Sequence, residues 1–247
     1  MSTIRSQRRG PMRERSRRAA CVNGLAIAFA ALFWGGLAHA QSAVGVDFGL
    51  YFDNGTRTDD ERIGPSHEVE RDEVTNARIA SVSAHYLHAL SDEPLHGFRL
   101  GGELVYRGER AYRDNDDRRS AMGTVLELGF RGDWTAVVAP SLGLTLGMRV
   151  SLAVLFVGGE LEDEITRLSD EGVSVGTGPR LGVVLIPSFG LRYALLERLH
   201  LRFDLGVGWS YLDGLDLDER VQGVDYTRTL SVSGTRIEVG LGAEITF

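Results

Sequence analysis

The clearest pattern along the chain is a strict alternation of apolar residues with polar residues or glycine. In the last segment, 229–247, apolar side chains occupy every second position from Ile237 to Phe247, and charged residues, glycine or threonine fill the positions between. Side chains on a β-strand point alternately to the two faces of a sheet. The segment therefore predicts a strand with one apolar face and one polar face.

Seven further segments carry the same period of two and are predicted as strands: 43–52, 75–89, 97–107, 120–131, 137–157, 178–195 and 199–212. Two of them alternate less cleanly. The segment 75–89 is weakly patterned, and 178–195 contains Pro187, which cannot donate a hydrogen bond to a neighbouring strand. We expect a bulge or a frayed stretch at this proline.

One of these strands, 137–157, is apolar and long enough to be considered as a transmembrane helix. From Leu142 to Phe156, however, eight large apolar residues fall on the even positions, and small or polar residues fill the odd positions as far as Ala153. A helix would scatter the two sets around its circumference and bring Arg149 toward lipid. The alternation therefore favours a strand.

The connections between the eight predicted strands alternate in length. Long polar segments occupy 53–74, 108–119, 158–177 and 213–228, whereas the short connections occupy 91–96, 132–136 and 195–198. An even number of strands with long loops at one end and short turns at the other is typical of outer-membrane barrels. The pattern predicts an all-β fold, an antiparallel eight-stranded transmembrane β-barrel with up-and-down meander topology, with both ends of the barrel domain on the short-turn side.

The first forty residues have the pattern of an export signal. Seven arginines lie within 1–18, an apolar run follows at 19–37, and Ala38-His39-Ala40 resembles a cleavage site. This order predicts a cleaved secretory signal peptide at 1–40 and a barrel domain at 41–247. An anchor that is never cleaved is the alternative. The barrel domain contains no cysteine, so disulfides and thiol chemistry are excluded there.

Charge limits the classes of partner. The formal net charge is −7 for the whole chain, and it becomes −13 once the seven arginines and the single glutamate of 1–40 are removed. Such acidity argues against nucleic acid as a partner. Divalent cations and basic partners remain possible.

With this strand pattern and a terminal Phe247, the chain resembles the small eight-stranded outer-membrane barrel proteins of the OmpA/OmpX type over 41–247. The resemblance implies a monomer in the outer membrane of a Gram-negative bacterium, in contact with membrane lipids and lipopolysaccharide, with no cofactor. It also implies recognition by the barrel-assembly machinery, through an insertion signal in the last strand. Position 245 is isoleucine where that group often has an aromatic residue. The expected signal residues are Val239, Leu241, Ile245 and Phe247.

The polar faces of the predicted strands carry many charges that would point into the barrel. Eight strands leave an interior that side chains can fill, and buried ions must be paired or hydrated. Hairpin geometry predicts Arg99 opposite Glu127 and Asp204 opposite Glu238. We interpret the interior as a plug of paired charges, with a narrow path for water or small solutes as the alternative. The inward positions are Asp47, Arg99, Glu103, Glu127, Arg149, Arg180, Arg192, Arg202, Asp204, Arg236, Glu238 and Glu244.

The predicted loops are acidic, which indicates a structural or surface-interaction role. Asp213, Asp216 and Asp218 lack the spacing and the glycine of an EF-hand loop, so we expect no metal site there. A lipid-modifying enzyme is a further alternative, because Ser83 and His85 share a face of the second predicted strand. Asp47 lies on the same predicted wall, and His67 next to Glu68 is a second candidate. No recognisable motif joins these residues, so we expect no enzyme.

Overall fold

The computed structural model describes residues 42–247, apart from 77–79, 91–95, 114–118 and 222. The predicted signal peptide at 1–40 lies outside these residues and stays a prediction. Among the described residues, no helix is long and apolar enough to cross a membrane.

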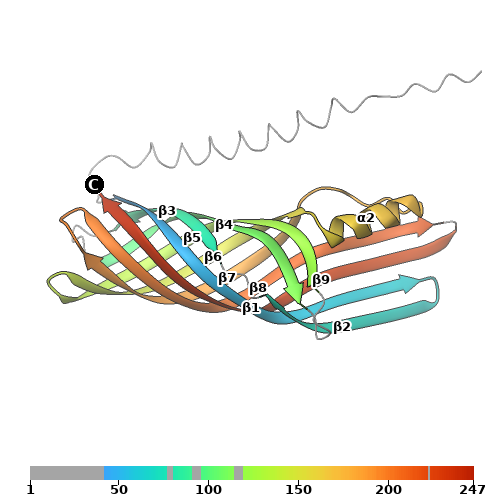
Figure 1. Cartoon of the computed structure of the whole chain (residues 1–247), viewed down its shortest axis with the longest axis horizontal. Coiled ribbons are helices and arrows are strands. Elements are labelled where there is room, and N and C mark those ends of the chain that lie inside the picture. Colours follow the sequence, from blue (N-terminus) through green and yellow to red (C-terminus); the bar gives the residue numbers. More distant parts are fainter. Residues whose placement is uncertain (1–41, 77–79, 91–95, 114–118, 222) are drawn as a thin grey trace, which may run out of the picture. The chain divides into compact units, whose positions relative to one another are not determined.

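The described residues form one antiparallel sheet that closes on itself (Figure 1). Strand β1 pairs with β3 through its first half and with β9 along nearly its whole length. Its second half pairs with β2, so β2 and β3 together take the place of one strand, and eight strands surround the lumen. The prediction of an eight-stranded barrel with meander topology is confirmed. The strands are β1 (Ser42–Ile63), β2 (Ser66–Asn76), β3 (Ser81–Ala89), β4 (Gly97–Arg113), β5 (Arg119–Ala139), β6 (Leu142–Val157), β7 (Arg180–Ala194), β8 (Leu199–Val221) and β9 (Val224–Thr246).

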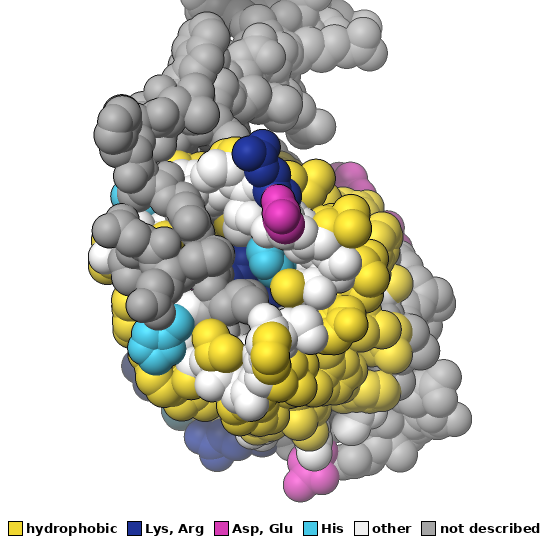
Figure 2. Space-filling model, turned by 90° about the vertical axis from the view of Figure 1, so that its left-hand side faces the viewer, with side chains coloured by type: hydrophobic (Ala, Val, Ile, Leu, Met, Phe, Trp, Pro, Cys, Tyr) yellow, Lys and Arg dark blue, Asp and Glu magenta, His cyan; other side chains and the backbone are white. Residues whose placement is uncertain are grey.

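The outer wall of the barrel is apolar. Phe48, Phe130 and Leu241 are each more than 60% exposed, and large apolar side chains are exposed on every strand of the wall. In Figure 2, which looks onto the end of the barrel, hydrophobic side chains surround a centre where basic and histidine side chains are visible. A soluble monomer rarely exposes a contiguous apolar area of this extent. The wall therefore faces hydrocarbon, and closure of the sheet satisfies its backbone groups there.

Two of the predicted loops are regular hairpins. The segment 53–74 belongs to β1 and β2, which turn at Gly64, and 213–228 belongs to β8 and β9, which turn at Gly223. The prediction of loops in these two segments was wrong. Both faces of the sheet contact water there, so charged residues occupy both faces and the alternation of apolar and polar residues disappears. The same applies to 108–113, which continues β4.

The third predicted loop, 158–177, contains an α-helix, α2 (Glu160–Asp170). It begins after Gly159, whose φ of 60° favours glycine. Three carboxylates in the first turn and Arg167 in the last complement the helix dipole. Leu161, Ile165 and Leu168 form one buried stripe at helical spacing. In Figure 1 the helix lies beside the long hairpins, at the opposite end of the barrel from the C-terminus.

The connection between β5 and β6 lies later than predicted. The expected turn at 132–136 is part of β5, and the chain reverses at Pro140 and Ser141. Charged and polar residues in 131–135 suggested a turn, but Asp133 and Thr135 are fully buried inside the barrel. At Pro187 the predicted disturbance is confirmed, because pairing between β7 and β8 stops after Leu185 and resumes at Ser188 in the same register.

Candidate functional site

The lumen is filled by charged side chains that contact one another. Among the described residues, eight carboxylates and seven guanidinium groups take part in the ion pairs of this interior. A buried ion without a partner costs several kcal/mol, so the network has to be nearly complete. We call this set the lumen network; it consists of Asp47, Asp53, Glu103, Glu127, Asp133, Asp204, Glu238, Glu244, Arg99, Arg107, Arg131, Arg149, Arg192, Arg202 and Arg236.

At the end of the lumen near the C-terminus, Glu244 is the common acceptor. Arg99 Nη1 donates to its Oε1 at 2.6 Å, and Arg202 Nη1 donates to its Oε2 at 3.0 Å. Arg192 bonds the same carboxylate and also contacts His200 Nδ1 at 3.3 Å. Three arginines from β4, β7 and β8 therefore converge on one residue of β9 and tie the strands together across the barrel.

Asp133 and Asp204 connect this end to the middle of the lumen. Arg202 Nη2 donates to Asp133 Oδ2 at 2.9 Å, and Arg131 Nε donates to Asp133 Oδ1 at 3.1 Å. Arg131 reaches Asp204 Oδ2 at 2.9 Å with its Nη2. Arg202 contacts three carboxylates and Arg131 contacts four, and the planar fork of arginine provides five N–H donors for such contacts.

The other end of the lumen is held by a second group of paired charges. Arg107 donates twice to Glu127, at 2.5 and 2.9 Å, and Arg236 Nη1 donates to the same carboxylate at 2.6 Å. Both guanidinium carbons also lie over the ring of Tyr51, at 4.8 and 5.3 Å from its centroid. The aromatic face adds a further electrostatic attraction for both guanidinium groups.

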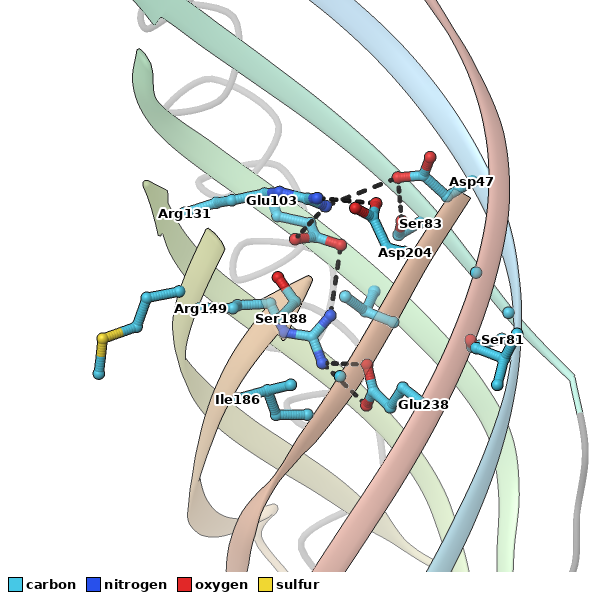
Figure 3. A pocket seen from close by; sticks show the side chains of 16 residues that line it. Asp47, Ser81, Ser83, Glu103, Arg131, Arg149, Ile186, Ser188, Asp204 and Glu238 are labelled. Carbon is cyan, nitrogen blue, oxygen red and sulfur yellow. Dashed lines mark hydrogen bonds and ion pairs between the residues drawn. The ribbon is translucent and has the colours of Figure 1, made fainter. Parts of the chain in front are cut away.

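Between these two groups the lumen contains a cavity of about 60 Å³ (Figure 3). Arg149 crosses it, donating to both oxygens of Glu238 at 2.8 and 2.7 Å and contacting Glu103 at 3.4 Å. Roughly four water molecules fit in such a volume. The lining is polar enough to hold them, so the cavity is suited to water and too small for a larger solute.

His85 lies between two carboxylates of the lumen. Its Nδ1 is 3.0 Å from Asp47 Oδ2, and its Nε2 is 3.4 Å from Glu244 Oε2. Ser83 also donates to Asp47, at 3.3 Å. Nucleophilic catalysis of the Ser-His-Asp type needs the imidazole between the serine and the acid. Here the acid lies between the other two, and all three are buried, which does not favour a hydrolytic site.

The register differs from both predicted pairings. Arg99 lies opposite Asp133, and Glu127 lies opposite Val105. Asp204 lies opposite Gly240, so Glu238 is paired with Gly206. The predictions were wrong because they placed the centres of the two hairpins in assumed loops, whereas the strands continue and the actual turns shift the partners.

Eleven of the twelve predicted inward residues lie in the lumen network. The exception, Arg180, lies at the start of β7, where its Nη2 donates to the Gly176 carbonyl at 2.6 Å. The other four members of the network were not predicted: Arg107 and Arg131 end the predicted strands 97–107 and 120–131, and Asp53 and Asp133 fall in the predicted loop 53–74 and the predicted turn 132–136. A period of two extended past 52 and 131 would have placed both aspartates on the inward face.

Beyond the charges, the far end of the lumen is closed by an apolar core. Leu161, Ile165 and Leu168 of α2 pack with Leu215 and Leu230 of the long hairpins. Arg228 on β9 fastens the helix from outside, with Nη1 donating to Glu164 at 2.5 Å. The hydrogen bond from Arg167, together with that from Arg228, lowers the pKa of Glu164 to about 2. The prediction of 158–177 as a loop did not include this closure.

The residues of the expected insertion signal lie on the outer face of β9. Leu241, Ile245 and Phe247 are exposed, and Val239 is partly exposed. The backbone of Phe247 exchanges two hydrogen bonds with Ser42, at 3.0 and 3.2 Å, beside the line where β9 meets β1. Recognition of the four expected signal residues by the barrel-assembly machinery stays a prediction. Among the described residues, no group of three or more potential ligands is placed to hold a metal ion.

Comparisons with known proteins concern the fold. No protein family matches the chain, and no curated protein matches it. Among solved structures, the chain is similar to the outer membrane protein OprG from Pseudomonas aeruginosa, with 12% identity, a TM-score of 0.51, and coverage of 84% of this chain and 96% of OprG.

Weaker similarities exist to two further barrels. Neisserial surface protein A shares 14% identity, with a TM-score of 0.37 over 83% of this chain and 97% of that protein. The outer membrane protease OmpT from Escherichia coli shares 8% identity, with a TM-score of 0.32 over 84% and 97%. Of the three, only the OprG likeness is close enough to support an argument. The chain therefore has the fold of the small outer-membrane β-barrel proteins.

Proposed function

We propose that the protein is an outer-membrane barrel whose lumen does not conduct ions. We further propose that the end with the long hairpins and α2 binds a cationic partner at the cell surface. The segments that project from the apolar wall, 56–75, 160–171 and 213–228, contain eighteen carboxylates and six arginines. We call these three segments the acidic extension. In outer-membrane barrels the long connections are extracellular, so the acidic extension would face the outside of a Gram-negative bacterium.

The observation that carries the proposal is the pairing of like charges in the β1–β2 hairpin. Glu61 lies directly opposite Glu68, whereas Asp59, which lies opposite Glu70, is already paired with Arg228 and Arg57. Like charges at opposed positions of a sheet are destabilising. Glu68 and Glu70 are exposed, so a cationic group of a partner could reach them and relieve the repulsion. Binding would then stabilise the hairpin as well as the complex.

The remaining partners are proposed from the location. Membrane lipids and lipopolysaccharide would contact the apolar wall of the barrel, and the barrel-assembly machinery would act on the β9 strand. Closure of the sheet leaves the wall without a free strand edge, which is consistent with a monomer. Removal of 1–40 would precede assembly.

Binding of a lysine decapeptide to the full-length protein in lipid nanodiscs tests the surface role. We expect submillimolar binding that weakens steeply with added salt, because long-range charge attraction is screened. The variant Glu61→Gln/Glu68→Gln/Glu70→Gln should bind at least tenfold more weakly. A matched variant, Glu162→Gln/Asp163→Asn/Asp170→Asn, removes the same charge from α2 and should lose less than threefold. Equal losses in the two variants would contradict a site on the hairpin.

A narrow channel is the second candidate, because the lumen contains the cavity crossed by Arg149. Two layers of ion pairs and the apolar core flank this cavity, which supports the closed alternative. Single-channel recording in planar bilayers separates the two. We expect no conductance from a folded barrel, as verified by heat-modifiable gel mobility. Steady openings that change in Arg149→Gln or Glu103→Gln would establish the channel instead.

Catalysis on lipid is the third candidate and has the least support. The order of Ser83, Asp47 and His85 does not provide an activated nucleophile, and His67 is engaged by Asp60 at 3.1 Å. Expression of the protein should leave the mass of lipid A unchanged. A mass change that His85→Ala or His67→Ala abolishes would show an enzyme.

A further inference from the structure

A second cavity lies at the base of the acidic extension. It has a volume of about 270 Å³ and is lined by residues of β1, β2, β5, α2, β8 and β9. No lining residue is shared with the water-sized cavity of the lumen. This second cavity, which we call the α2 pocket, is large enough for an organic molecule, and neither the closed lumen nor the charged surface accounts for it.

The lining of the α2 pocket is divided into an apolar floor and a polar rim. Six apolar side chains, all buried, form the floor: Val74, Met122, Leu161, Leu215, Leu230 and Val232. The rim contains Arg57, Ser120, Glu160, Glu164 and Arg228. An apolar cavity with a few polar groups at one side is the usual composition of a small-molecule site. An apolar cavity of about 150 Å³ holds benzene, so the α2 pocket would accept a body of roughly six to eight carbon atoms.

The rim favours a positive head group on such a molecule. Arg228 donates to both oxygens of Asp59, at 2.9 and 2.8 Å, and to Glu164. Arg57 contacts Asp59 at 3.4 Å. The two guanidinium groups are thus already engaged by carboxylates. Glu160 is exposed at the rim, and the surrounding acidic extension has three carboxylates for every arginine.

The N-terminus of α2 also favours an anion, because unpaired backbone N–H groups give it partial positive charge. Its first turn already contains Glu160, Glu162 and Asp163, which complement that charge. We propose that the α2 pocket binds a small hydrophobic cation, an amine whose apolar body lies on the floor and whose ammonium group faces Glu160. This inference does not depend on the proposed surface role.

The methionines of the chain provide a direct test. Only four are present; the Met122 side chain lines the α2 pocket, whereas Met148 is half exposed on the outer wall. The full-length protein is labelled with ¹³C-methyl methionine, placed in lipid nanodiscs and titrated with hexylamine, hexanol and hexanoate. Met122→Leu identifies the reporting signal. We expect hexylamine to shift the Met122 methyl signal to saturation. Hexanoate should bind at least tenfold more weakly than hexylamine, and the affinity of hexanol should lie between the two.

Two variants show whether the α2 pocket is the site. Leu161→Phe fills the floor and should abolish the Met122 shift while the barrel keeps its heat-modifiable mobility. If that variant does not fold, Ala121→Val, a smaller addition to the same lining, serves instead and should weaken binding at least threefold. Glu160→Gln should weaken hexylamine several-fold and leave hexanol unchanged, whereas Glu162→Gln, one position along the helix, should have no effect.

Three results would overturn the proposal. Equal, unsaturated shifts of Met122 and Met148 would show that the amine only partitions into the bilayer. Hexanoate binding as tightly as hexylamine would contradict a cation site. Unchanged binding in both pocket-filling variants would place the ligand elsewhere. None of these results bears on the lysine decapeptide, which is tested through the β1–β2 hairpin.

Discussion

Arg236 and Asp53 form a two-point ion pair across the strands that close the barrel. They lie directly opposite each other on β9 and β1, and Arg236 donates from Nε and Nη2 to the two oxygens of Asp53 at 2.5 and 2.9 Å. The residues are 183 positions apart in the chain. Because Arg236 also bonds Glu127 on β5, one fully buried side chain joins the closing strands to the opposite wall.

Loss of Arg236 should therefore destabilise the barrel strongly. In Arg236→Leu, Asp53 and Glu127 each lose a partner while they stay buried, and breaking a buried ion pair in this way costs about 3–5 kcal/mol. The measurement is the free energy of unfolding in urea, for the protein folded in lipid vesicles. Arg236→Leu/Asp53→Asn should recover part of the loss, because one uncompensated charge is removed as well.

A surface arginine provides the matched control for this measurement. Arg220 pairs with Asp225 at 3.5 Å in the β8–β9 hairpin, and both side chains are largely exposed. Arg220→Leu should change the unfolding free energy by less than about 0.5 kcal/mol. Similar losses in Arg220→Leu and Arg236→Leu would mean that the lumen network contributes no more than a solvated pair.

Two inward glycines on β9 are expected to differ sharply in their tolerance of a methyl group. A Cβ at Gly242 would coincide with the Asp47 carboxylate, whereas at Gly240 the nearest atom is Asp204 Cβ at 3.9 Å. Gly242→Ala forces Asp47 away from Ser83 and His85 and should cost about 1–3 kcal/mol, as overpacking does. Gly240→Ala should be neutral or slightly stabilising, because alanine restricts the unfolded chain.

Thermal or urea unfolding of the two glycine variants in the same lipid vesicles provides the comparison. Both substitutions add one methyl group to the same strand and the same face, two positions apart, so differences in strand propensity cancel. Equal stabilities would show that the Asp47 contacts have no structural importance.

The docking of α2 is expected to depend on its apolar stripe. Leu168 is 2% exposed in the apolar core between α2 and the long hairpins. Truncation of a buried leucine to alanine costs about 2–5 kcal/mol. We expect α2 to open as a local unit, so this cost should appear in the opening of the helix. Amide hydrogen exchange of α2 should accelerate about 30-fold or more in Leu168→Ala, since each 1.4 kcal/mol is a factor of ten.

Thr166→Ala is the control for the helix. Thr166 lies on the exposed side of α2, and alanine has the higher helix propensity, so exchange should be unchanged or slower. Acceleration in both variants would indicate that helix propensity, and not packing on the barrel, holds α2 in place.

These predictions rest on features that the sequence reveals to different degrees. Where a strand crosses lipid, one face must be apolar, so alternation in segments such as 97–107 identifies the strand and its inward charges. In the acidic extension, water surrounds both faces of the hairpins, so neither face has to be apolar. The continuations of β1 and β8 into this region therefore lack the alternation and were not predicted as strands. The partner of Arg99 depends on where the neighbouring hairpin turns, and no alternation in 108–119 marks that position in the sequence. The stripe of Leu161, Ile165 and Leu168 was visible at helical spacing, but its acidic surroundings suggested a loop.

The attachment of α2 should also depend on pH through Glu164. Hydrogen bonds from Arg167 and Arg228 lower the pKa of this carboxyl to about 2, from an ordinary value of 4.5. A folded-state pKa below the unfolded value means that the carboxylate stabilises the docked helix fully above about pH 5. This contribution then decreases as the pH falls from 4.5 toward 2. Glu164→Gln should weaken docking at pH 7 and remove this component of the pH dependence.

Protease cleavage within α2, followed as a function of pH with pepsin below pH 5 and trypsin at pH 7, measures the docking. The wild-type helix should be less susceptible than Glu164→Gln at pH 7, and the difference should shrink toward pH 2, where the carboxyl group is half protonated. Glu162→Gln changes an exposed carboxylate on the same helix and should follow the wild-type curve. If the wild-type and Glu164→Gln curves were parallel over this range, the ion pair between Glu164 and Arg228 of β9 would not fasten α2 to the barrel.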